Sequence, residues 1–123
     1  MTTEQNANAL RPATGAMVMV SIPNEVARLK EGVQWKSGDR HAVSIVKDHP
    51  LNVLLMVLKK GAKLHEHHAK GPIALQVVSG SIRFRAVKEC LVSAGELIGL
   101  DRNVPHSVEA LEESAIILIT AID

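Results

Sequence analysis

Short apolar runs separated by turn-forming residues follow one another from residue 38 to the end of the chain. Apolar and polar side chains alternate in residues 41–47, which is the two-residue period of a strand with one buried face. Residues 51–58 are almost entirely apolar, as expected of a strand covered on both faces. Further strands are expected at residues 63–68, 73–78, 82–87, 90–92, 96–100, 106–111 and 115–122. Strands spaced about 8–12 residues apart, with turn residues between them, predict an all-β sandwich or barrel.

The chain before residue 38 predicts a helix preceded by a short strand. Residues 21–31 fit one short helix, because Ser21 can cap its N-terminus, Pro23 suits its first turn and Gly32 ends it. Residues 17–20 are apolar and form a candidate docking strand ahead of this helix.

Length and composition indicate a single domain. The chain has 123 residues, of which 46% are hydrophobic. A chain of this size buries about two-thirds of the surface that its unfolded form exposes, which is enough for a core without disulfides. Residues 1–15 are small and polar, so we expect a mobile arm there and one domain over residues 16–123.

Charge and cysteine content limit the classes of partner and the cellular compartment that we expect for this protein. Cys90 is the only cysteine, so no internal disulfide can form, which fits a reducing cytoplasm. The N-terminus has no basic stretch followed by an apolar core, and the apolar runs are too short to cross a bilayer. The net charge is +1 and Trp35 and Phe84 are the only aromatic residues, which argues against a nucleic-acid surface. We therefore expect a cytoplasmic protein with neither membrane nor nucleic-acid partners.

Histidines are the candidate chemistry of the chain. If residues 63–68 are extended, His65 and His67 share one face of the strand, and His68 lies on the other. His106 follows a proline at the start of a later strand and is the candidate third member. Three imidazoles with open coordination positions suit Zn, Fe, Ni, Cu or Mn and do not choose among these metals. The alternative is that these histidines are ordinary solvated side chains at strand edges.

Three other side chains have ordinary explanations. Arg83 and Arg85 alternate with apolar neighbours, the pattern of a half-exposed strand, although they would hold an anion if that face lined a pocket. Cys90 has no base near it in the sequence, which favours a small packed side chain over a nucleophile.

Two segments resemble the paired motifs of the cupin superfamily. In the first, the glycine and first histidine positions are Gly61 and His67, and the closing glycine is Gly80. The second histidine and the glutamate of that motif fall on Ala69 and Ile73, so the spacing is kept while two ligand types are lost.

The second motif begins at Gly95 and ends at His106, where the family has its last histidine ligand. Its usual proline is Asp101, and its second glycine is replaced by Asn103, a residue that also accepts a left-handed turn. The chain is most similar to the small single-domain, conserved-barrel cupins of bacteria. This resemblance implies an all-β double-stranded β-helix barrel, commonly dimeric, with a pocket between the histidine strands.

These observations lead to three functional hypotheses. The first is a cupin that binds a small-molecule ligand in the barrel mouth, with a divalent metal at His65, His67 and His106 as a candidate cofactor. The second is a metal-dependent enzyme such as an oxygenase. The third is metal-free acid–base isomerisation, which ranks last because the chain has no tyrosine to act as the acid. Fold alone does not decide between binding and catalysis. A homodimer is expected, because residues 17–20 have no partner within a compact barrel unless they pair at an exposed sheet edge, and a two-fold dimer covers both edges with the same surface.

Overall fold

The computed structural model describes residues 17–122, so the arm expected at residues 1–15 lies outside the described part of the chain. Two short helices precede the strands, α1 (Ile22–Glu31) and α2 (Val33–Ser37). The strands follow as β1 (Arg40–Asp48), β2 (Leu51–Leu58), β3 (Lys63–His67), β4 (Ile73–Ser79), β5 (Ser81–Arg85), β6 (Glu89–Ser93), β7 (Leu97–Leu100), β8 (His106–Ala110) and β9 (Ser114–Ala121). Every strand expected from residue 38 onward is present, with its ends within a few residues of the expected ones.

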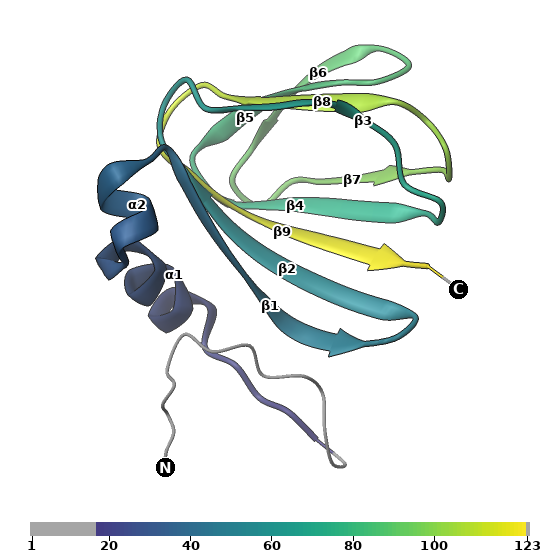
Figure 1. Cartoon of the computed structure of the whole chain (residues 1–123). Helices are drawn as coiled ribbons and strands as arrows, with labels where there is room; N and C mark the ends of the chain where they lie inside the picture. The colour runs from purple at the N-terminus through teal and green to yellow at the C-terminus, as the bar shows by residue number, and fades with distance from the viewer. Residues whose placement is uncertain (1–16, 123) are drawn as a thin grey trace.

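The strands form two antiparallel sheets that face each other (Figure 1). One sheet has five strands in the order β1-β2-β9-β4-β7, and the other has four in the order β3-β8-β5-β6. The chain crosses between the sheets repeatedly, which is the arrangement of a double-stranded β-helix. The expected all-β barrel is therefore confirmed.

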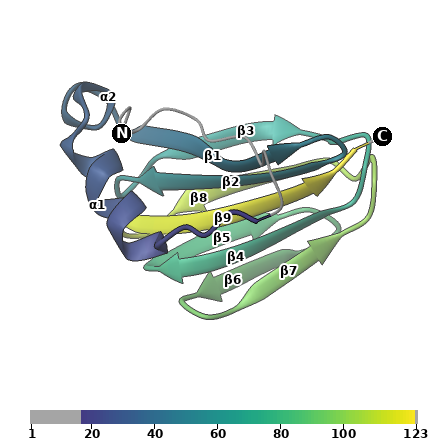
Figure 2. The same ribbon diagram turned by 90° about the horizontal axis from the view of Figure 1, so that it is seen from below.

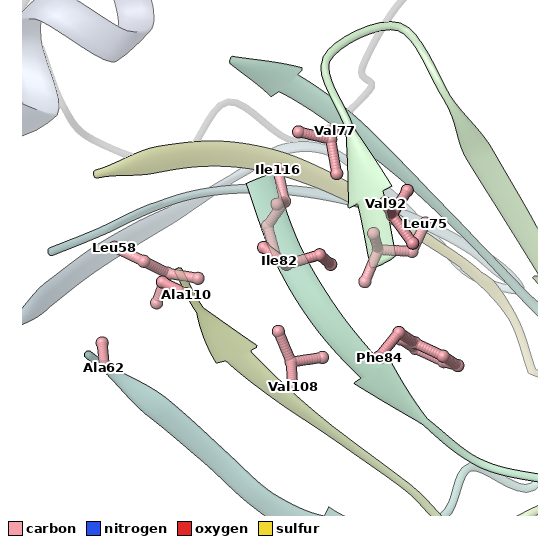
Figure 3. Packing of buried hydrophobic residues seen from close by; sticks show 10 residues of the cluster. All are labelled: Leu58, Ala62, Leu75, Val77, Ile82, Phe84, Val92, Val108, Ala110 and Ile116. Carbon is pink, nitrogen blue, oxygen red and sulfur yellow. The ribbon is translucent and has the colours of Figure 1, made fainter. Parts of the chain in front are cut away.

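The main core fills the space between the two sheets. Ten buried side chains meet there (Figure 3), one from the turn before β3 (Ala62) and nine from the two sheets, namely Leu58, Leu75, Val77, Ile82, Phe84, Val92, Val108, Ala110 and Ile116. On β5 and β8 the buried residues alternate with polar ones, so each strand turns one face inward and one outward.

A second cluster joins the two helices to the outer face of the five-stranded sheet. Leu29 of α1 and Trp35 of α2 pack on Val43, Leu55 and further apolar residues of β1, β2 and β9. Both figures that show the whole chain place the helices at one end of this sheet (Figures 1 and 2). At the other end of the barrel, where β3 stops and β8 starts, residues 17–122 place no helix (Figure 1).

The N-terminal expectations are confirmed in part. Ser21 caps α1, because its hydroxyl accepts a hydrogen bond from the Asn24 backbone N–H at 3.4 Å. Residues 17–20 form no strand in the described chain, and Met17 and Met19 are exposed. The sequence pattern assigned no element to residues 33–37, because a five-residue helix is too short to show a helical period.

The turns of the two motifs have left-handed backbone conformations. Gly61, Gly80 and Gly95 have φ values of 88°, 85° and 88°, and Asn103 has a φ of 63°. Asn103 thus takes the left-handed turn that was expected of it in place of a glycine. Within residues 17–122, no helix has the length and apolar character that crossing a bilayer requires.

Candidate functional site

Two of the three candidate histidines meet at the uncovered end of the barrel. His67 is the last residue of β3, His106 is the first residue of β8, and the two residues are direct partners in the antiparallel pairing. Their ring centroids lie 4.3 Å apart with ring planes at 60°. His106 is 4% exposed, whereas His67 is open to solvent. The pair therefore has one buried ring and one accessible ring.

Backbone carbonyls orient both imidazoles in the same way. His67 Nδ1 lies 2.8 Å from the carbonyl oxygen of His65, and His106 Nδ1 lies 2.9 Å from that of Val104. A carbonyl oxygen can only accept a hydrogen bond, so Nδ1 carries the proton and donates it in each ring. In the neutral ring Nε2 then has a free lone pair, which can accept a hydrogen bond, take up a proton or bind a metal ion.

Phe84 supports the buried ring from inside the barrel. Its ring is stacked on that of His106, with centroids 5.7 Å apart and planes 14° apart. Phe84 is itself almost fully buried in the main core. His106 is thus held by a hydrogen bond, a strand pairing and an aromatic wall, which fixes the direction of its Nε2.

A pocket of about 400 Å³ lies beside His106. It is bordered by His106 and by residues of three segments around it, namely Glu66, Arg85, Ala86, Val87, Val104, Pro105 and Ser107. The walls combine apolar side chains with a few polar groups, the usual composition of a small-molecule site. Of the two paired histidines, His106 is the one that borders this pocket.

His65 does not join the pair, because β3 is irregular. Leu64 pairs with Val108 and His67 pairs with His106, so three steps along β3 match two steps along β8. One extra residue of this kind is a β-bulge, and it reverses the inward and outward alternation. His65 instead lines another pocket of about 210 Å³ on the outer face, which borders the pocket beside His106 through Glu66, Arg85 and Ser107. The argument that the two-residue period puts His65 and His67 on one face is therefore wrong.

The donor set falls short of an ordinary metal site. Within residues 17–122, no group of three or more histidine, cysteine, aspartate or glutamate side chains is placed to hold a metal ion. Metal sites usually need at least three protein donors, and His67 and His106 supply two. Ala69 and Ile73, which stand where the cupin motif has ligands, have no donor atoms in their side chains. Metal coordination by His65, His67 and His106 stays a prediction.

The outer-face pocket is electrostatically balanced by ion pairs. Arg83 Nη1 lies 2.9 Å from Glu109 Oε1, and Arg83 Nε lies 3.3 Å from Glu89 Oε2. Arg85 Nε donates to Glu89 Oε1 at 2.8 Å, and this hydrogen bond is the main reason that the pKa of Glu89 lies below its ordinary value. The expected half-exposed pattern of Arg83 and Arg85 is confirmed, and both side chains form ion pairs with glutamates.

The remaining histidines lie apart from the pair. His68 and His49 are exposed, and His41 Nδ1 lies 2.9 Å from the carbonyl oxygen of Leu29, where it joins β1 to α1. His49 and His68 therefore have surface positions, and His41 has a structural one. Phe84 is the site residue that the sequence analysis missed, because its contact with His106 depends on how β5 and β8 align.

Known structures share this architecture. No protein-family model matches the sequence, and no curated protein matches it either. Among solved structures, a cupin 2 conserved barrel domain protein from Leptotrichia buccalis has 29% sequence identity and a TM-score of 0.66, over 76% of this chain and 46% of that one. A cupin-2 domain containing protein from Shewanella frigidimarina has 15% identity and a TM-score of 0.67, over 83% of this chain and 93% of that one.

A third neighbour is a metalloenzyme. The oxalate decarboxylase of Bacillus subtilis, described with Mn(II) centres, has 25% identity and a TM-score of 0.59, over 68% of this chain and 25% of that one. This chain thus corresponds to about a quarter of the length of the decarboxylase. All three neighbours share the barrel fold with this chain. Two are described only as cupin-domain proteins, and the third is described as an enzyme.

Proposed function

We propose that this chain, which has the cupin fold of its structural neighbours, binds a small molecule at the barrel end marked by His67 and His106. The observation that carries the proposal is the shared orientation of the two rings. Each donates Nδ1–H to a backbone carbonyl and so keeps the lone pair of Nε2 for a ligand. His106 lines a pocket of about 400 Å³ and His67 is its strand partner, so both acceptors are already oriented when a ligand arrives.

The ligand chemistry follows from these acceptors. A lone pair on nitrogen favours a hydrogen-bond donor, such as a hydroxyl or an ammonium group. His106 is nearly completely buried, so an Nε2 that finds no donor in a closed complex costs free energy, on the order of 1–3 kcal/mol. Molecules that bring a donor to this position are therefore selected over equally sized molecules that bring none.

A metal-dependent enzyme is the second candidate. The paired Nε2 lone pairs favour it, since imidazole nitrogen is the commonest protein ligand for Zn, Cu, Fe and Ni. A divalent ion on His67 and His106 would act as a Lewis acid on a substrate oxygen. Because the described residues supply two donors, such an ion would take its other ligands from the substrate, from water or from a shifted His65.

Nitrogen NMR of the histidine side chains tests the proposal. In protein labelled with ¹⁵N, we expect His67 and His106 to show the Nδ1–H form without ligand. Phenol and methylammonium serve as probes that carry a hydrogen-bond donor. We expect them to shift the Nε2 resonances of His67 and His106, and to leave those of exposed His49 unchanged. Equal shifts at His49, or no shift with either probe at millimolar concentration, would contradict the proposal.

Elemental analysis separates the two candidates. The protein is purified without a metal-affinity tag, so that the column contributes no ion. One Mn, Fe, Cu, Ni or Zn per chain would favour the enzyme, and its removal by a chelator should then abolish the effect of the probes. Probe binding by metal-free protein would favour the binding protein.

A further inference from the structure

An apolar cavity of about 230 Å³ lies where the two sheets come apart. β6 and β7 are edge strands of different sheets, and no hydrogen-bonded pairing joins them in the described chain (Figure 1). The cavity is bordered on one side by the β5–β6 hairpin and on the other by β7. Its lining residues are Phe84, Ala86, Val87, Lys88, Cys90, Ile98, Gly99 and Leu100.

The walls of this cavity suit a hydrocarbon. Apart from Lys88 at the turn, its side chains are aliphatic, aromatic or a thiol, and none of them offers a strong hydrogen-bonding group. An enclosed engineered cavity of about 150 Å³ takes up benzene. The present cavity is larger and is open to solvent at Val87 and Lys88, so it has room for one aromatic ring. It is too small for a drug-sized molecule, since such sites begin at roughly 300 Å³.

Two contacts connect the cavity to the histidine pair. Phe84 forms part of its wall and is stacked on His106 at 5.7 Å. Ala86 and Val87 border both this cavity and the pocket beside His106. The two spaces are therefore neighbours, with the turn of the β5–β6 hairpin between them.

We infer that this cavity between β6 and β7 holds the apolar body of the ligand, a single aromatic ring or a branched alkyl group with a hydrogen-bond donor at one end. The body packs against Phe84, Ile98 and Leu100, and the donor reaches toward His106 past Ala86. The donor end rests on the proposed function. The apolar end stands without it, because it depends only on the cavity and its walls.

The single cysteine provides a test in the unaltered protein. Cys90 is half-buried in the cavity wall and is the only thiol of the chain. Toluene, which fits the cavity and carries no donor, should slow alkylation of Cys90 by iodoacetamide several-fold and in a saturable way. An alkylation rate that toluene leaves unchanged would overturn the inference.

A cavity-filling substitution gives a second test. Cys90→Leu adds volume inside the cavity, and we expect toluene affinity measured by NMR to fall at least tenfold. The matched control is Leu91→Ile, because Leu91 is the next residue of β6, faces outward and is 65% exposed. If Cys90→Leu does not fold, Ala86→Leu narrows the same cavity at its border with the other pocket. Unchanged toluene affinity in a folded filling variant would overturn the inference.

Phenol distinguishes failure of the inference from failure of the proposed function. Phenol has the ring of toluene plus a hydroxyl group. We expect His106→Phe to weaken phenol binding about tenfold, because the acceptor for the hydroxyl is lost. Toluene binding should be unchanged, since a ring still stacks on Phe84. Toluene binding with equal phenol affinity in both proteins would leave the cavity assignment in place and contradict the role of His106. Phenol binding at His106 with no toluene binding would support the role of His106 and contradict the cavity assignment.

Discussion

Leu64 and His67 are three positions apart along β3, yet their pairing with β8 puts the two side chains on the same side of the strand. Their partners on β8 are Val108 and His106, which are only two residues apart and are both buried. The extra residue of β3 lies between them and displaces His65 to the outer face. The bulge therefore selects which histidine joins His106.

The first prediction concerns this selection. His67→Ala should weaken methylammonium binding about 2–10-fold, because the ammonium group can donate to both rings and this change removes one neutral acceptor. His65→Ala and His68→Ala are matched controls on the same segment, and we expect both to bind methylammonium like the unaltered protein. Isothermal titration calorimetry of the three variants measures this. A loss in His65→Ala as large as that in His67→Ala would mean that β3 loses its bulge when ligand binds.

The second prediction compares two turn glycines. Gly80 and Gly95 both have left-handed backbone conformations, so alanine strains either position by about 1–2 kcal/mol. A Cβ at Gly80 would also approach Ser114 Oγ to 2.3 Å and Glu113 O to 2.4 Å, whereas a Cβ at Gly95 meets nothing within 4 Å.

We therefore expect Gly80→Ala to lower the free energy of unfolding more than Gly95→Ala, by about a further 1–3 kcal/mol for the overpacking. Denaturant titration followed by fluorescence of Trp35, the only tryptophan, gives both values. Equal losses would show that the β4–β5 turn and Ser114 move apart at little cost.

The third prediction concerns the ion pair that closes the β5–β6 hairpin. The hydrogen bond from Arg85 lowers the pKa of Glu89, with a smaller contribution from Arg83. A carboxyl whose folded pKa is depressed stabilises the fold above its unfolded pKa, and this contribution disappears as the pH falls through the folded pKa. Arg85→Gln should therefore move the pKa of Glu89 upward, toward its ordinary value.

Side-chain carboxyl NMR across acidic pH measures this shift directly. Lys70→Gln removes one positive charge elsewhere on the surface and serves as the control, with no change expected at Glu89. Because the pair is exposed, added salt should also raise the pKa of Glu89 in the unaltered protein. An unchanged Glu89 in Arg85→Gln would contradict the assignment of Arg85 as the main cause.

The fourth prediction is the homodimer. Leu97 of β7 is 58% exposed on the outer face of the five-stranded sheet. Met17 and Met19 are 85% and 89% exposed. We expect a two-fold dimer to cover Leu97 and the segment that holds the two methionines. Leu97→Glu should shift sedimentation toward the monomer, whereas Leu91→Glu, on the outer face of the other sheet, should not. A monomeric unaltered protein at micromolar concentration would contradict the prediction.

Strand positions were largely predictable from the sequence because the barrel strands are short and separated by glycine, proline and asparagine. The left-handed turn at Asn103 was predictable for the same reason, since few other residue types accept a positive φ. The position of His106 at a strand start next to a pocket also agrees with its place in the second motif.

The errors came from features that depend on contacts between distant segments. The face of His65 was derived from a two-residue period, which holds only while a strand pairs without interruption, and the bulge at residues 64–67 is set by β8. The stacking of Phe84 on His106 depends on the alignment of β5 with β8, which no local pattern records. The bulge in β3 also explains why His65 is not a third donor beside His67 and His106.

The two imidazoles differ in mechanical freedom. His106 begins an inner strand that is hydrogen-bonded to β3 on one side and to β5 on the other, whereas His67 ends an edge strand that has β8 as its single partner. His106 is therefore held in a strand that is paired on both sides, and His67 in a strand that is paired on one side. Amide hydrogen exchange should accordingly be faster at His67 than at Val108. Substitutions in the segment after β3 would tune how fast a ligand leaves while the direction of its hydrogen bond to His106 stays the same.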